Sequence, residues 1–136
     1  MENKEIIIDG TNEILGRLAS YAAKQALQGN SIIIVNAEKV IILGSRAEIA
    51  ERYKKWIKQG GSSQKGPKVV RTSERILKRT IRGMVPHKFS RGSDAMDIIR
   101  CYDGVPAKYE SVKKITSGKD KGGKFITVGE LVSLIR

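Results

Sequence analysis

Four long cations recur three or four residues apart in the middle of the chain: Arg75, Lys78, Arg79 and Arg82. At about 100° per residue of an α-helix, these side chains fall within an arc of roughly 100°. The apolar positions that share the helix, and that could dock it on a core, are Ile76, Leu77, Ile81 and Met84. A helix with one cationic and one apolar face suits a folded protein that binds a polyphosphate partner.

The basic character continues beyond this helix. Residues 71–91 hold seven Lys/Arg against one acid, Glu74. Ser73 is expected to cap the start of the helix, and Gly83 with Pro86 to end it. Residues 85–91 then predict an extended basic loop that carries His87 and Lys88.

The charge of the whole chain points to the same kind of partner. The 136 residues include 26 Lys+Arg against 14 Asp+Glu, a formal net charge of +12. Residues 61–91 carry nine of these cations and one acid, whereas the segments before and after are nearly balanced. A charged helix face is often merely solvated. This run, however, is long, almost free of acid, and holds most of the excess positive charge. It therefore indicates a binding partner that is a nucleic acid or, as the second choice, an anionic membrane.

Phosphate-binding loops of nucleotide enzymes do not fit the glycines. Residues 10–17 have one residue too many between glycines for the G-x-x-x-x-G-K-[ST] pattern, and residues 61–66 are followed by Pro67 where lysine is required. The G-x-G-x-x-G pattern does not occur. The glycines are therefore interpreted as turn residues.

Other residue types capable of chemistry have simpler interpretations. His87 could act as a general base, but it has cations on both sides and no carboxylate nearby in sequence, so phosphate contact or packing suits it better. Asp94 and Asp97 could bind a metal, yet a helix N-terminus accounts for Asp94. Cys101 is interpreted as a core thiol. One cysteine and one histidine allow neither an internal disulfide nor a structural zinc site of the usual kinds.

Composition sets further expectations. Aromatic residues make up 5% of the chain, which argues against binding that relies mainly on stacked single-stranded bases. No apolar run approaches the ~20 residues of a membrane span, and residues 1–5 lack the features of a signal peptide. We expect a cytosolic protein without a cofactor.

The strands and helices predicted on either side of the cationic helix indicate an α/β fold. Residues 5–9 and 31–36 read as buried strands joined by a helix over 14–28, which makes a parallel βαβ unit. Residues 37–43 could be a helical turn or extended, and a capping box at 45–48 opens a second helix to about 59. After the cationic helix come a short helix from Ser93 or Asp94 and a strand at 100–102. Further expectations are a short strand near 112–116, an edge strand at 125–126 and a terminal helix opened by a capping box at 127–130. Together these predict a single domain, residues 1–136, with three α/β/α layers and a mainly parallel sheet of about four strands.

Three blocks of sequence are similar to those of a known family. They are residues 8–20 (IDGTNEILGRLAS) continuing to 26–27 (AL), residues 34–40 (IVNAEKV) with Gly44, and residues 82–92 (RGMVPHKFSRG) continuing to 102–106 (YDGVP). On these blocks the chain resembles the L-thirteen family of ribosomal large-subunit proteins, above all its archaeal form. It lacks the His-Thr-Gly-Tyr-type stretch of bacterial members after the second long helix, where it has GGSS. It also lacks the long basic C-terminal extension of eukaryotic members.

The resemblance implies a structural protein of the large ribosomal subunit, without enzymatic activity, that binds large-subunit rRNA and joins the particle early in assembly. It implies neighbouring ribosomal proteins as partners, and neither a membrane nor a small-molecule substrate. Arg17 lies in the family's Gly-Arg motif and is a further candidate for RNA contact. The expected RNA-binding residues, in the basic segment of about 61–91 and at this motif, are Lys65, Lys68, Arg71, Arg75, Lys78, Arg79, Arg82, His87, Lys88, Arg91 and Arg17.

Two rival functions are also compatible with the sequence. One is a small nucleotide-dependent or RNA-modifying enzyme, which would need convergent acid/base groups or a phosphate loop at the strand ends. The other is a free-standing RNA chaperone, which would not travel with the large subunit.

Overall fold

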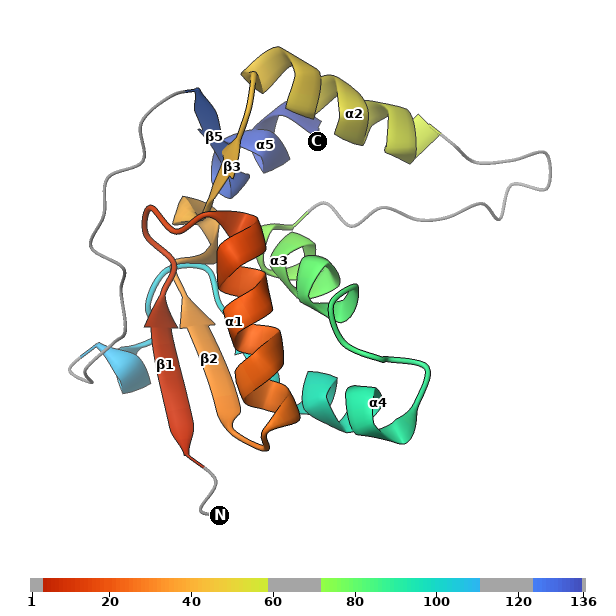
Figure 1. The fold of residues 1–136 in the computed structure, drawn as a ribbon. Helices are drawn as coiled ribbons and strands as arrows, with labels where there is room; N and C mark the ends of the chain where they lie inside the picture. Colours follow the sequence, from red (N-terminus) through yellow and green to blue (C-terminus); the bar gives the residue numbers. More distant parts are fainter. Residues whose placement is uncertain (1–3, 59–71, 111–123, 136) are drawn as a thin grey trace.

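The computed structural model describes residues 4–58, 72–110 and 124–135 (Figure 1). Its centre is a parallel sheet of β1 (Glu5–Asp9), β2 (Ser31–Val35) and β4 (Ile99–Cys101), in the order β1-β2-β4. Ile7 pairs with Ile33, which in turn pairs with Arg100. The uninterrupted isoleucines of β1 and β2 suit strands covered on both faces. The predicted parallel βαβ unit is confirmed, and the third strand begins one residue earlier than expected.

The crossover helix α1 (Leu15–Leu27) lies across one face of this sheet (Figure 1). Its buried side chains are those expected from the sequence: Leu15, Leu18, Ala19, Ala22, Ala23 and Ala26. Four of these are alanines, whose small side chains allow a close approach to the strands. Gly29, with φ +94°, takes the left-handed conformation that follows the end of the helix.

Residues 37–43 adopt both of the conformations that the sequence left open. They form a 3-10 helix, η1 (Ala37–Lys39), and then a strand, β3 (Ile41–Leu43). β3 pairs antiparallel with β5 (Phe125–Thr127), with Ile42 opposite Ile126. The expectation that residues 125–126 extend the edge of the main sheet is therefore wrong. Their partner is a second, two-stranded sheet, where Ile126 is fully buried.

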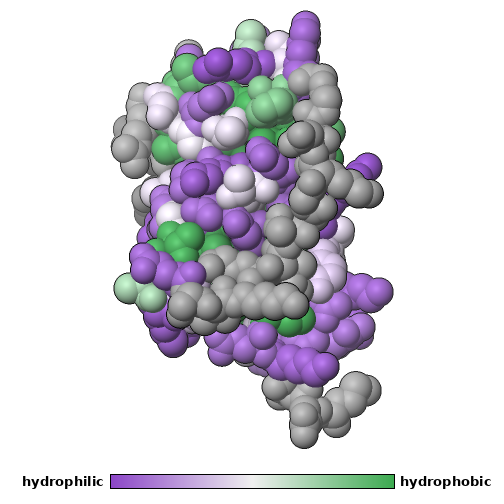
Figure 2. All heavy atoms as spheres, turned by 90° about the vertical axis from the view of Figure 1, so that its left-hand side faces the viewer, coloured by the Kyte–Doolittle hydropathy of each residue, from purple (hydrophilic) through white to green (hydrophobic). Residues whose placement is uncertain are grey.

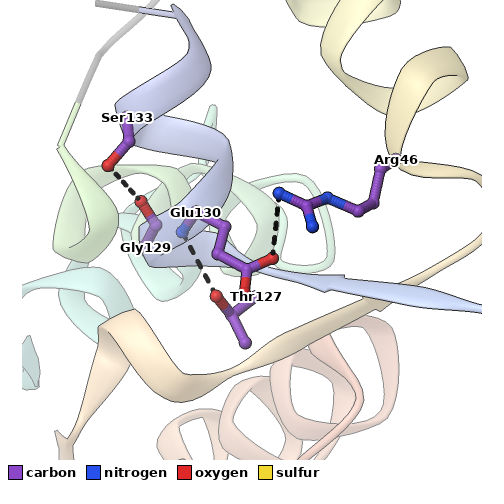
Figure 3. Close-up of polar contacts among 5 residues, drawn as sticks. All are labelled: Arg46, Thr127, Gly129, Glu130 and Ser133. Atoms are coloured by element: carbon purple, nitrogen blue, oxygen red, sulfur yellow. Dashed lines mark hydrogen bonds and ion pairs between the residues drawn. The ribbon is translucent and has the colours of Figure 1, made fainter.

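Two helices lie beside this second sheet, α2 (Arg46–Lys58) and α5 (Val128–Ile135). The start of α5 has the predicted cap, because the Glu130 N–H donates to Oγ1 of Thr127 at 3.2 Å (Figure 3). Arg46 of α2 lies 3.8 Å from the Glu130 carboxylate. Both side chains are about half exposed, so this ion pair orients the two helices more than it stabilises them.

The main hydrophobic core lies between the sheet and the helices, and a smaller cluster lies on the opposite face of the sheet. That cluster contains Ile7, Ile33 and Val35, and it is covered in the described part by Tyr109 of the 3-10 helix η2 (Ala107–Tyr109). The fold is thus of the predicted α/β class with a small, mainly parallel sheet. In the part of the chain described, no helix is long and apolar enough to cross a membrane.

Candidate nucleic-acid interface

The predicted cationic helix is α3 (Ser73–Arg82). Its buried residues are Ser73, Ile76, Leu77 and Ile81. This face packs against α1, β4, η1 and α5. Thr72, not Ser73, occupies the N-cap position in an extended conformation, so the expected cap was placed one residue late. Gly83 is the C-cap, as predicted.

The four cations of α3, here called the cationic face, are Arg75, Lys78, Arg79 and Arg82. The three arginines are exposed and Lys78 is partly buried. Helical projection places Arg75 and Arg82 at the centre of the arc, with Lys78 and Arg79 at its two borders. The predicted amphipathic arrangement of cations opposite Ile76, Leu77 and Ile81 is confirmed.

The two border residues have different titratable neighbours. On one side, burial raises the pKa of the Cys101 thiol in β4 to about 12, and the nearby charge of Lys78 opposes part of that rise. On the other side, burial raises the pKa of Tyr53 in α2, and Arg79 and Arg52 oppose it. Lys78 is therefore near Cys101 of β4, as Glu74 is, and Arg79 is near Tyr53 of α2. Because the Cys101 thiol stays protonated at neutral pH, it is a poor nucleophile, as the core interpretation predicts.

The segment after α3 is compact rather than extended, which corrects the sequence prediction. Residues 83–89, here called the basic turn, fold back through hydrogen bonds from Met84 N–H to the Ile81 carbonyl (2.9 Å) and from His87 N–H to the Val85 carbonyl (2.8 Å). Buried Val85 anchors the turn in the core. Met84, expected on the apolar side of the helix, is 43% exposed because the chain leaves the helical path at Gly83.

His87 closes this turn onto the end of α3. Its Nδ1 lies 3.2 Å from the carbonyl oxygen of Arg82, within hydrogen-bonding distance. When Nδ1 carries the proton, it satisfies one of the carbonyls that the helix end leaves without a helical partner. Lys88, next in the chain, is exposed. The turn therefore presents Lys88 directly after the cationic face.

Helix α4 (Ser90–Asp97) begins three residues before the position expected from Ser93. Its first turn includes exposed Arg91 and buried Gly92. A Cβ atom at Gly92 would overlap the carbonyl of Pro86 and approach the His87 nitrogen to 2.7 Å. Gly92 therefore allows the basic turn to lie directly against α4. The predicted helix began at Ser93 or Asp94, which left Gly92 outside it, so the pattern of the sequence gave no signal for this contact.

The predicted RNA-binding set has four further members. Arg17 is exposed in the first turn of α1, on a different element from the cationic face and the basic turn. Lys65, Lys68 and Arg71 lie outside the described residues, as does the strand expected near 112–116. The structure thus brings together α3, the basic turn and the start of α4, which run down the right-hand side of Figure 1, away from β1.

The strand ends, where an enzyme of this class would bind its ligand, are occupied by internal hydrogen bonds. Oδ1 of Asp9 accepts bonds from the Thr11 N–H and hydroxyl and from Nδ2 of Asn36. Glu38 accepts a 2.8 Å bond from the Gly104 N–H. These two carboxylates hold the three loops that follow β1, β2 and β4 together, which is a structural role.

The glycine loop after β1 is likewise committed to the fold. The Gly10 N–H donates to Val35, the Asn12 N–H to Lys39 and the Glu13 N–H to Gly10. These amides are not arranged to bind a phosphate, in agreement with the turn interpretation. Asp94 and Asp97 are exposed on α4, and the described residues contain no group of three or more metal-binding side chains.

The opposite side of the molecule has a different character. Seen from the β1 side, hydrophobic residues gather toward the top of Figure 2, at the height of β3 and β5 in Figure 1. Leu43 and Phe125, paired across these strands, are 49% and 40% exposed. Beside them lies an open hollow lined by Ser45, Arg46, Ala47, Lys124 and Phe125.

Comparison with known proteins agrees with these features. Residues 3–108 match the family model described as "Ribosomal protein L13". The chain is 44% identical to the large ribosomal subunit protein uL13 of Methanosarcina barkeri, over 92% of this chain and 93% of that protein. It is 43% identical to the uL13 of Archaeoglobus fulgidus, over 92% and 83% of the two chains, and 39% identical to that of Caenorhabditis elegans, over 85% and 58%. The chain therefore belongs to the ribosomal protein L13 family, and its resemblance to the archaeal form is confirmed.

Proposed function

We propose that this protein is a structural constituent of the large ribosomal subunit, in the cytoplasm, where it binds large-subunit rRNA through α3, the basic turn and the start of α4. The family consists of structural ribosomal proteins and not of enzymes. The observation that carries the proposal is geometric. Arg75, Arg79 and Arg82 are exposed on a helix whose opposite face is buried, and Lys88 and Arg91 follow on a hydrogen-bonded turn.

This arrangement suits the sugar-phosphate backbone of RNA. Arginine guanidinium groups bind phosphate oxygens with two parallel hydrogen bonds, whereas Lys88 acts as a point charge. The N-terminus of α4 adds backbone N–H groups beside Arg91, and its first turn carries no acid. Because side chains cannot easily enter the deep major groove of A-form RNA, recognition follows RNA shape more than sequence.

The remaining predicted cations are further RNA contacts in the proposal. Lys65, Lys68 and Arg71 precede α3 in sequence, and the family's motif adds Arg17. About six to eight neutralised phosphates would give a log–log salt slope of roughly −5 to −7. We infer that the chain acts as one domain, without a cofactor, and joins the subunit early, since its binding needs RNA backbone and not a preassembled protein surface.

We assign contact with neighbouring ribosomal proteins to the opposite side. Leu43 and Phe125 expose apolar surface beside Arg46, unlike the cationic face, where arginine side chains are the exposed groups. Exposed apolar side chains next to one another are typical of protein contacts. A free RNA chaperone would have less need for such a surface.

The test is cosedimentation. The tagged protein, expressed in an archaeal host, should sediment with the large subunit at low salt and be released as salt is raised. A protein that stays in the soluble fraction under all salt conditions would contradict the ribosomal assignment. Isothermal titration calorimetry with ATP and GTP tests the alternative that the protein is a nucleotide-dependent enzyme. Saturable binding of either nucleotide would support that alternative.

A further inference from the structure

One aromatic ring stands out on the proposed RNA surface. Phe89, at the end of the basic turn, is 71% exposed, whereas the other exposed large hydrophobic side chains of the described residues are 40–49% exposed. It lies between Lys88 and Arg91, and the sequence from 75 to 91 contains no Asp or Glu. Phe89 therefore places an apolar ring between the exposed cations Lys88 and Arg91.

The backbone of Phe89 is held on both sides. Its N–H donates to the Pro86 carbonyl at 3.0 Å, and its carbonyl accepts the Ser93 N–H at 3.0 Å. Phe89 is also the N-cap of α4, in an extended conformation, but its side chain caps nothing. Close packing of Gly92 against Pro86 fixes this turn further. The ring is thus presented to solvent from a fixed backbone, and packing within the described fold does not account for it.

We propose that Phe89 stacks on an unpaired base of the bound RNA. This inference rests on the proposed rRNA-binding function. An aromatic face stacks on any base, while Lys88 and Arg91 can neutralise the phosphates on either side of that base. The base must be unpaired, because a base inside a continuous A-form stem is already stacked on its neighbours.

The charge of the surroundings favours RNA over a protein partner. A protein that covered Phe89 would also have to cover Lys88 and Arg91 with acidic groups, whereas RNA supplies both the π-face and the phosphates. Low aromatic content had argued against stacking as the main mode of binding. A single ring that adds one stacked base to a phosphate-driven interface agrees with that composition.

The experiment measures affinity for deproteinised large-subunit rRNA from Methanosarcina barkeri over a series of salt concentrations. The variants are Phe89→Ala, Phe89→Leu, Phe89→Tyr and, as a matched control from the same turn, Lys88→Ala. Stacking on one base predicts that Phe89→Ala and Phe89→Leu lower affinity by about fivefold or more at every salt concentration, with an unchanged salt slope. Phe89→Tyr should retain the wild-type affinity. Lys88→Ala should reduce the slope by about one.

Several outcomes would overturn the inference. If Phe89→Leu binds like the wild type, the ring contributes only apolar contact. If Phe89→Ala also binds like the wild type, the ring does not contact RNA, and a protein partner is favoured. Failure of the wild-type protein to bind rRNA would instead contradict the proposed function itself. Circular dichroism melting checks folding, and the high exposure of Phe89 predicts an unchanged melting temperature for all of its variants.

A second readout is independent of affinity. Phe89→Trp in a Trp56→Phe background leaves one indole, at the proposed stacking position. Stacking on a base should quench its fluorescence when rRNA is added. Unquenched emission from a variant that still binds rRNA would overturn the inference.

Discussion

Gly92 of α4 and Pro86 of the basic turn lie so close that a methyl group on Gly92 would overlap the Pro86 carbonyl. This contact sets the position of the turn, and with it the directions of Lys88 and Phe89, relative to α3. The proposed RNA surface therefore depends on a helical residue that carries no charge.

Gly92→Ala is expected to lower stability, although alanine favours helices more than glycine does. The backbone of Pro86 would have to move, and overpacking of this kind costs about 1–3 kcal/mol. Chemical denaturation measures the change, and rRNA affinity should fall with it.

Gly16→Ala is the matched control for that variant. Gly16 is also helical, in α1, but a Cβ atom there would meet no heavy atom within 4 Å. This substitution should raise the free energy of unfolding by up to about 1 kcal/mol, the difference in helix propensity. The same sign for both variants would contradict the proposed role of Gly92.

Reversing the charge of Arg75, Arg79 and Arg82 to glutamate should weaken rRNA binding by several orders of magnitude while unfolding stays cooperative. All three side chains are exposed and lie opposite the buried face. Filter binding measures affinity, and thermal melting measures cooperativity. Loss of the folded state would show that the cationic face is structural.

The control for this triple variant carries the same change in net charge on α2, at exposed Arg52, Lys54 and Lys55. If binding depends on the position of the cations, this control should lose much less affinity than the α3 variant. Equal losses would mean that total charge alone drives the interaction.

Leu77→Ala should destabilise the protein by about 2–5 kcal/mol, because the Leu77 side chain on the core-facing side of α3 is fully buried and its removal leaves a cavity. Met84→Ala, seven residues further on, should change stability by less than about 0.5 kcal/mol, because Met84 is 43% exposed. Urea denaturation compares the two. A large effect of Met84→Ala would instead favour the longer apolar face that the sequence predicted.

Cys101 makes stability depend on pH in the alkaline range. Burial raises its pKa in the folded protein from 9.0 to about 12, so above pH 9 the unfolded chain loses this proton while the folded protein retains it. The contribution of Cys101 to the free energy of unfolding is at its full value below pH 9. Between pH 9 and 12 it falls by up to about 1.4 kcal/mol per pH unit.

Comparison with Cys101→Ala isolates this contribution from that of Tyr53, whose pKa is also raised by burial. The wild type should lose more stability than the variant between pH 8.5 and 10.5. Parallel pH profiles would contradict the burial of the thiol. At pH 8, a thiol reagent should label the unfolded chain much faster than the folded protein.

Local periodicity in the sequence was enough to predict several elements. Uninterrupted isoleucines in β1 and β2 predicted buried parallel strands, and alanine spacing predicted the face of α1. The spacing of Arg75, Lys78, Arg79 and Arg82 predicted one exposed edge of α3. These predictions succeed because helix and strand geometry assign side chains to faces every 3.6 or 2 residues, whatever the rest of the chain does.

Features that depend on contacts between distant residues could be seen in the fold alone. The partner of Phe125–Thr127 is β3 and not the main sheet, because strand pairing joins residues far apart in sequence. Met84 left the apolar face when the chain turned at Gly83, since helical projection holds only as far as the helix does. The compact basic turn combines local hydrogen bonds, the burial of Val85 and the contact of Gly92 with Pro86, and spacing along the chain could not reveal that contact.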